Sequence, residues 1–163
     1  MRIKIMAESA DHKEKSTPEW THFIDVDDIQ DNEMRLTISP DAEELKHLER
    51  RLGLEKLKNV SAKLKLKRLD RRVVKVIGSL EADVVQNCVV TLQPVEDHLE
   101  DSFEAWYADP EQAVSFARAR HERDKDKGAE ERPMLEEHED PESIIDGRIN
   151  VGELVTQYLS LSI

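Results

Sequence analysis

The sequence predicts an α+β fold, a mainly antiparallel sheet with two packed helices and a mobile charged linker. Over residues 60–66 and 74–84, apolar side chains alternate with charged or small ones. This alternation predicts strands, because successive strand residues point to opposite faces of a sheet. Helix-capping signatures near residues 39 and 150 predict the two helices.

The amino-terminal third of the chain predicts a loop, two short strands and a helix. Residues 8–18 contain almost no large apolar side chain and predict the loop. Strand-like segments follow at 23–29, where aspartates interrupt the apolar residues, and at 34–38. A serine–proline pair at 39–40 then predicts a helix over 40–52, with the serine as N-cap and the proline at the first helical position. A glycine directly after this range fits the end of the helix.

The central segment predicts a meander of four strands. In the first, residues 60–67, the apolar side chains point one way and the lysines point the other. A turn at 69–72 leads to a partner strand at 73–84. An apolar run at 88–92 predicts the third strand, and 98–107, where several apolar residues share one face, predicts the fourth.

The rest of the chain predicts a linker between two helical segments. Residues 109–112 resemble a helix start, and 113–123 are compatible with a short helix. Residues 124–142 have mixed charge, one glycine and two prolines, and we expect them to form a flexible acidic linker. Asn150, with Glu153 three residues later, predicts the cap of the C-terminal helix.

Length and composition predict one cytoplasmic domain spanning residues 1–163. The chain is 38% hydrophobic and 37% charged, and it has no apolar run of the roughly 20 residues that cross a bilayer. Its first residues lack the apolar core of a signal peptide. The single cysteine excludes an internal disulfide and a multi-cysteine metal site within one chain.

The charge distribution is uneven. A net charge of −12 argues against generic binding to DNA, to RNA or to anionic membranes. Residues 56–75 nevertheless contain nine Lys or Arg and one acidic residue, whereas 129–143 contain seven Asp or Glu and one Arg. The acidic segment is either a solubilising spacer or a shield that competes with RNA for the basic segment.

The basic segment is the best candidate for a binding site. Lys63, Lys65 and Lys67 lie on one side of the predicted strand, about 6.6 to 7 Å apart, which is close to the phosphate repeat of a nucleic-acid strand. Alternatively, they are solvated lysines that protect a sheet edge from aggregation. The residues that we predict as RNA or partner contacts are Lys63, Lys65, Lys67, Arg68, Arg71, Arg72 and Lys75.

Two further residues are predicted to be structural. Gly78 lies on the apolar side of its strand, where a missing side chain allows a bulge or close packing. Cys88 is expected in the core, because free cysteine is among the most buried residue types. A nucleophilic role for Cys88, with His98 or His47 as base, lacks any recognisable catalytic context. The six histidines show no metal-binding spacing, and we predict no metal and no cofactor.

Several of these residues also carry a resemblance to a known family. The order runs Gly78-x-Leu-x-Ala-x-Val, three residues, Cys88-x-x-x-Leu-x-Pro-Val, and then an acidic strand ending at Phe103. Together with the block from Ile145 to Val155, it resembles the YceD family in its alphaproteobacterial form. Members are bacterial and plastid proteins linked to accumulation of the large ribosomal subunit's RNA. They usually continue into a proline-bearing tail, so the end at Ile163 suggests a truncated chain or a lost tail.

The resemblance implies a non-enzymatic factor for large-subunit RNA accumulation or assembly, whose partner is a large-subunit precursor or its RNA. The basic hairpin would make the contact. The alternative is an acidic adaptor for a ribosomal protein or a lipid-synthesis enzyme, since genes of the family commonly neighbour both. An enzyme is the least favoured class, because the sequence lacks a convergent acid, base, nucleophile or phosphate-cradling loop.

Overall fold

The computed structural model describes residues 18–29, 33–70, 73–109 and 141–163. Its main sheet has five strands in sequential order, β2 (Glu33–Ile38), β3 (Lys56–Asp70), β4 (Val73–Asn87), β5 (Pro94–Ala108) and β6 (Glu142–Ser143). All neighbours in it are antiparallel except β5 and β6. A second sheet pairs β1 (Phe23–Asp25) with β7 (Arg148–Asn150), and the short helix η1 (Val26–Asp28) follows β1. The predicted α+β class, with a mainly antiparallel sheet and two helices, is confirmed.

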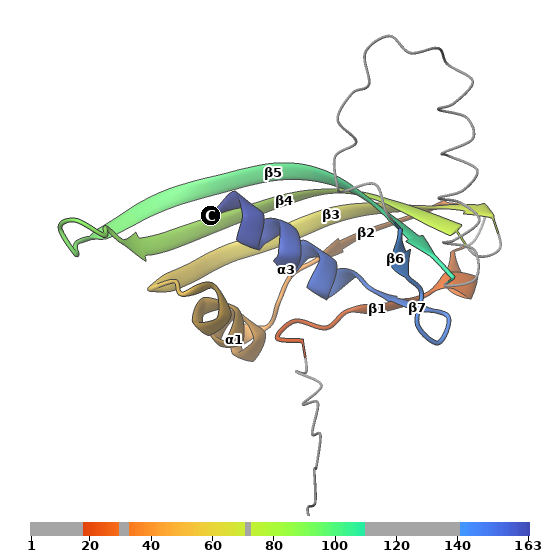
Figure 1. The fold of residues 1–163 in the computed structure, drawn as a ribbon, viewed down its shortest axis with the longest axis horizontal. Coiled ribbons are helices and arrows are strands. Elements are labelled where there is room, and N and C mark those ends of the chain that lie inside the picture. Colours follow the sequence, from red (N-terminus) through yellow and green to blue (C-terminus); the bar gives the residue numbers. More distant parts are fainter. Residues whose placement is uncertain (1–17, 30–32, 71–72, 110–140) are drawn as a thin grey trace, which may run out of the picture.

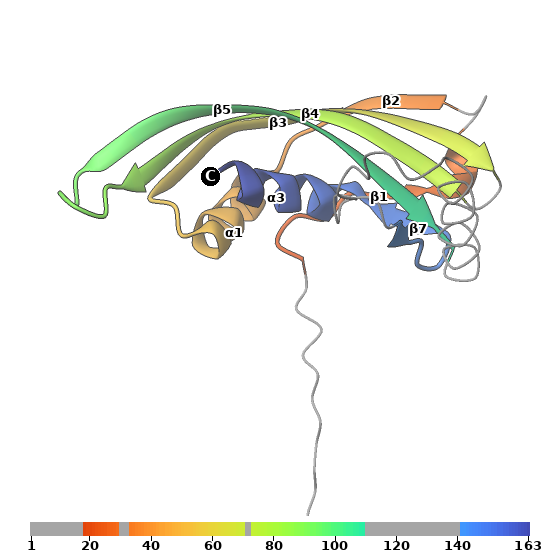
Figure 2. The same ribbon diagram turned by 45° about the horizontal axis from the view of Figure 1, so that its top comes forward.

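The main sheet is strongly curved, and everything else that the structure describes lies on its concave side. The helices α1 (Ala42–Leu52) and α3 (Val151–Ser162) lie beneath β3, β4 and β5, and the small β1–β7 sheet lies beside them (Figures 1 and 2). Within the described ranges, neither helix has the length and apolar character needed to cross a membrane.

The alternation in the sequence separates the two faces of the sheet as predicted. The apolar side chains of β3 and β4 form the core on the concave side, and they include Ala62, Leu64, Leu66, Val74, Val76, Leu80, Ala82 and Val84. The prediction of close packing at Gly78 is also confirmed. A Cβ there would overlap the Phe103 ring and would lie 2.8 Å from Leu64 Cδ2. The same ring stacks on Tyr158 of α3 with its centroid at 4.3 Å, so this glycine brings the sheet and the helix together.

The first helix forms where the sequence predicts it but begins at a different cap. Asp41, and not Ser39, is the N-cap, and its carboxylate accepts hydrogen bonds from the backbone N–H groups of Glu43 and Glu44. The Glu44 carboxylate accepts the Asp41 N–H in return, which completes a capping box. A carboxylate that caps two N–H groups at the positive end of the helix dipole outcompetes the serine hydroxyl. Gly53 ends the helix at φ +66°, as predicted.

The C-terminal helix is capped as predicted. Asn150 Oδ1 accepts hydrogen bonds from the backbone N–H groups of Glu153 and of His22. The helix buries Leu154, Val155 and Leu159 against the sheet.

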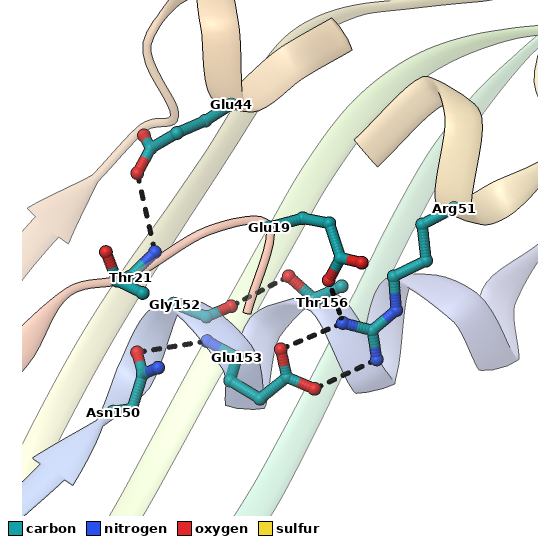
Figure 3. A network of polar contacts seen from close by, with 8 residues as sticks. All are labelled: Glu19, Thr21, Glu44, Arg51, Asn150, Gly152, Glu153 and Thr156. Atoms are coloured by element: carbon teal, nitrogen blue, oxygen red, sulfur yellow. Dashed lines mark hydrogen bonds and ion pairs between the residues drawn. The ribbon is translucent and has the colours of Figure 1, made fainter. Parts of the chain in front are cut away.

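A charged network ties the amino-terminal segment to both helices. Arg51 of α1 donates two hydrogen bonds of 2.9 Å to the Glu153 carboxylate of α3 and one of 2.6 Å to Glu19 (Figure 3). Burial is the largest single influence and opposes ionisation of Glu19, but the hydrogen bond from Arg51, a backbone hydrogen bond and the nearby positive charge of Arg51 together lower the pKa of Glu19. Thr21 donates its N–H to Glu44 at 3.4 Å in the same region.

Two predicted strands differ from the structure. The segment at 23–29 forms only three residues of strand before η1 begins. The strand predicted at 88–92 is wrong, because β4 continues to Asn87, pairs there with Pro94 of β5, and leaves the residues between them as a turn. Because the pairing continues to Asn87 and Pro94, the apolar run forms the turn between β4 and β5, although the composition of the run favours a strand.

Some predictions fall outside the described residues. They are the loop at 8–17, the helix start and helix at 110–123, the linker at 124–140, and Arg71 with Arg72. Glu142, the last residue assigned to the linker, instead begins β6.

Candidate nucleic-acid interface on the outer face of the sheet

The lysines of β3 lie on the convex face, away from the helices. Lys63, Lys65 and Lys67 alternate with Leu64 and Leu66, whose side chains are buried in the core. The side chains of Lys63 and Lys65 are 68% and 40% exposed. Burial of the neighbouring leucines therefore fixes the three ammonium groups on the solvent side.

The neighbouring strands determine what surrounds these lysines. On β2, Arg35 is the partner of Lys65 and Glu33 is the partner of Lys67. Arg35 therefore extends the row of cations, although no motif in the sequence points to it. Only the register of β2 against β3 brings it there, and no local spacing in the sequence contains that information. We define the lysine surface as Arg35, Lys63, Lys65 and Lys67.

Carboxylates of the same face lie between these cations. Glu33 accepts a 2.8 Å hydrogen bond from Arg35 Nε and lies 3.3 Å from Lys65 Nζ. The Arg35 hydrogen bond, with a smaller contribution from Lys65, lowers the pKa of Glu33. Lys63 Nζ lies 3.8 Å from Glu81 of β4. Such exposed pairs contribute little to stability, so an incoming phosphate competes with them at small cost.

Lys75 of β4 lies opposite Lys67 but is engaged by β5. Its ammonium group is 2.7 Å from Glu104 and 5.0 Å from the centre of the Trp106 ring. Its side chain is only 23% exposed. The ion pair and the cation–π contact hold Lys75 against β5, so it is a weaker candidate for RNA contact than the lysines of β3.

Arg68 does not share this face. It follows the alternation of Leu64 and Leu66, and it lies opposite the buried Val74. Its guanidinium lies 3.5 Å from the Asp27 carboxylate and 3.5 Å from the Val26 carbonyl oxygen of η1. The prediction that grouped Arg68 with the three lysines is therefore wrong about its position. Arg71 and Arg72 lie outside the described residues.

Toward the other end of the sheet, the outer face becomes acidic. His98 Nδ1 of β5 lies 2.6 Å from the Asp83 carboxylate of β4, and His98 Nε2 lies 3.4 Å from Glu100. The hydrogen bond with Asp83, followed by that with Glu100, raises the pKa of His98. Hydrogen bonds from Asn59 and then from His98 lower the pKa of Asp83. The outer face is thus basic along β2 and β3, and it is acidic where β4 and β5 approach the turn that joins them.

The prediction of Cys88 as a core residue is wrong. Cys88 is half-buried at the start of the turn between β4 and β5. The Thr91 hydroxyl is the main cause that lowers the pKa of the thiol to about 7, and the backbone N–H groups of Thr91 and Val90 add to it. His98, one of the two bases considered for a nucleophilic Cys88, bonds to Asp83 and Glu100. Among the described residues, no three His, Cys, Asp or Glu side chains are grouped to hold a metal ion.

Comparison with known proteins identifies no relative, since no family model, no curated protein and no solved structure matches the chain. The resemblance to the YceD family therefore stays a prediction that rests on the residues named above.

Proposed function

We propose that this protein is a non-enzymatic factor that supports accumulation or assembly of the large ribosomal subunit's RNA. In this proposal the lysine surface contacts phosphate groups of a pre-ribosomal particle in the cytoplasm. The observation that carries the proposal is the exposed row of cations on the convex face, held on a strand whose other side is the core. The ribosomal context comes from the resemblance to the YceD family.

The chemistry of this surface suits backbone contact more than base recognition. Lysine binds phosphate as a point charge, and the row contains no aromatic side chain on which a base could stack. Glu33 and Glu81 lie among the cations, and the whole chain carries a net charge of −12. Both features oppose non-specific binding, so we expect contact with RNA to be weak in isolation and strongly dependent on salt.

RNA-binding measurements with two charge-matched variants test this proposal. The variant Lys63→Gln, Lys65→Gln and Lys67→Gln removes three cations from the surface. The control Lys46→Gln, Arg50→Gln and Lys58→Gln removes three exposed cations elsewhere. For large-subunit RNA fragments, we expect the first variant to lower the slope of log affinity against log salt by about 2 to 3, because each lost phosphate contact removes about 0.7 to 0.9. Equal slopes for both variants would reject the lysine surface.

Sedimentation of the tagged protein from its own cells tests the ribosomal context. Migration with large-subunit precursors that disappears after nuclease treatment supports the proposal. Migration at the top of the gradient in both conditions overturns it.

The second candidate is the acidic adaptor for a ribosomal protein or a lipid-synthesis enzyme. It is favoured by the acidic end of the outer face, where Asp83 and Glu100 surround His98. Association with such a partner would survive nuclease treatment, which separates the two candidates in the same gradients.

A further inference from the structure

The turn that joins β4 to β5 exposes a group of aliphatic side chains. Val89, Val90, Leu92 and Val95 are 92%, 85%, 76% and 52% exposed. We define the hairpin tip as residues 88–95. Large aliphatic side chains are normally exposed singly, whereas a cluster of them marks an interaction site.

The backbone of the tip also adopts an unfavourable conformation. Leu92 has φ +57°, a left-handed conformation that is easy for glycine or asparagine and unfavourable for leucine. Its N–H donates to the Cys88 carbonyl at 2.8 Å, and the Cys88 N–H donates to the Gln93 carbonyl at 2.8 Å. The residues from Cys88 to Gln93 include no glycine, asparagine or aspartate, the usual residues of such turns. Conformational strain and exposed apolar surface thus occur together at the tip. The strain lowers the stability of the fold and the exposed surface lowers solubility, so neither property explains this combination.

The position of the tip makes it accessible. The β4–β5 hairpin extends beyond α1 and beyond the C-terminal end of α3, so neither helix covers it (Figures 1 and 2). The tip lies at the opposite end of the sheet from β6 and β7 (Figure 1).

The charges around the tip select one kind of occupant. Glu96, Asp97 and Glu100 follow it on β5 and are exposed, and Glu55 lies at its base, bonded to Asn87 at 3.2 Å. A second copy of this chain would bring the same carboxylates together, and RNA or anionic lipid would be repelled. A protein surface with Lys and Arg beside an apolar pocket complements both the apolar group and its acidic surroundings.

We propose that the hairpin tip docks into an apolar pocket, rimmed by Lys or Arg, on a partner protein. Val89, Val90 and Leu92 enter the pocket, and Glu96 and Asp97 face the basic rim. This contact needs no RNA, so it stands whether or not the lysine surface binds phosphate.

Photo-crosslinking of the full chain in its own cells tests the proposal. The photoreactive amino acid p-benzoylphenylalanine replaces Val90, or, as a matched control, Ile145, which is 68% exposed and lies between β6 and β7. We expect a nuclease-resistant protein adduct from position 90 alone, and mapping should place it at apolar residues flanked by Lys or Arg. No adduct, or an adduct with RNA, lipid or a second copy of this chain, would overturn the proposal, as would the same adduct from both positions.

Affinity measurements on the purified pair then test the side chains themselves. Because they are exposed, Val89→Ser, Val90→Ser and Leu92→Ser together should leave the fold intact. We expect this variant to lose at least about tenfold in affinity for the crosslinked protein, as centrally buried interface residues do. Leu161→Ser, at a site 70% exposed on α3, should change affinity by less than about twofold. Equal affinities for the two variants would contradict docking through the tip.

Discussion

The two ends of the β4–β5 hairpin both carry apolar side chains but have opposite relations to solvent. Near β6, the inner side chains Phe103, Ala105 and Tyr107 are buried, and Phe103 stacks on α3. At the other end, Val89, Val90 and Leu92 are almost fully exposed. Both ends are apolar in sequence, so composition does not distinguish them. What differs is the presence of a helix beneath the chain, and an apolar segment contributes to stability only where something covers it.

The largest expected difference between the two regions comes from removing a leucine from each. Leu66 is fully buried whereas Leu92 is 76% exposed. We expect Leu66→Ala to lower the free energy of unfolding by about 2 to 5 kcal/mol, because it removes buried methyl groups and leaves a cavity. Leu92→Ala should change the same quantity by no more than about 0.5 kcal/mol. Urea denaturation measures both, and comparable losses would mean that the tip is packed in solution.

A smaller difference is expected between two arginines. Arg51 joins Glu19 and Glu153 with a one-third-exposed side chain, whereas Arg35 bonds Glu33 of its own strand and is 73% exposed. We expect Arg51→Met to cost about 1 to 3 kcal/mol, since it leaves two partly buried carboxylates facing each other. Arg35→Met should cost less than about 1 kcal/mol. Thermal unfolding of the two variants at equal ionic strength checks this order, and a reversal would show that the network of Figure 3 does not tie the helices together.

Relief of strain at the tip should increase stability. Replacement Leu92→Asn puts a residue that tolerates φ +57° at the left-handed position, and we expect a gain of about 0.5 to 1 kcal/mol in the free energy of unfolding. Val90→Asn, in the same turn but outside that conformation, is the control and should be nearly neutral. A loss of stability in Leu92→Asn would indicate that Leu92 makes a stabilising contact in the isolated protein.

Ionisation of the Cys88 thiol should have the smallest effect on stability, but the rate of alkylation measures that ionisation directly. With a pKa of about 7, half of the thiol is ionised at pH 7, compared with about 1% at the ordinary value of 9.0. Iodoacetamide should therefore label the folded protein with a midpoint near pH 7, and Thr91→Val should raise that midpoint. The pKa of Cys88 is lower in the folded protein than in the unfolded chain. Ionisation of this thiol therefore stabilises the folded protein fully above the unfolded pKa, and the stabilisation is lost as the pH falls through 7. A midpoint near 9 in the folded protein would contradict the hydrogen bond from Thr91.

The sequence predicted those features that depend on local periodicity and on capping. Alternation identified the two faces of β3, because a buried leucine at every second position forces each lysine outward. Asn150 was identified because its cap depends on residues only three positions away. The same alternation assigns Arg68 to the side of Leu66, so its position could also have been predicted.

Other features depend on pairing between distant residues and were not predictable. Arg35 joins the lysine surface only through the register of β2 on β3. The turn at Cys88 exists because Asn87 pairs with Pro94, although the valines and threonine between them favour a strand. The exposure of Val89 and Val90 depends on where the helices end beneath the sheet, which no local pattern specifies.

The pairing of β1 with β7 has a consequence for the order of events during synthesis. Phe23 pairs with Asn150, and the N–H of His22 bonds to the cap of α3, so the two segments can meet only after the strands between them have been made. The β3–β4–β5 meander can form first, because its contacts are closer in sequence. Until α3 emerges from the ribosome, Phe103 on the concave side of that meander lacks Tyr158, the ring on which it stacks. A nascent chain paused before residue 151 would therefore expose apolar surface on the concave side of the sheet. Such surface is prone to aggregation, and we expect the chain to depend on chaperones during that interval.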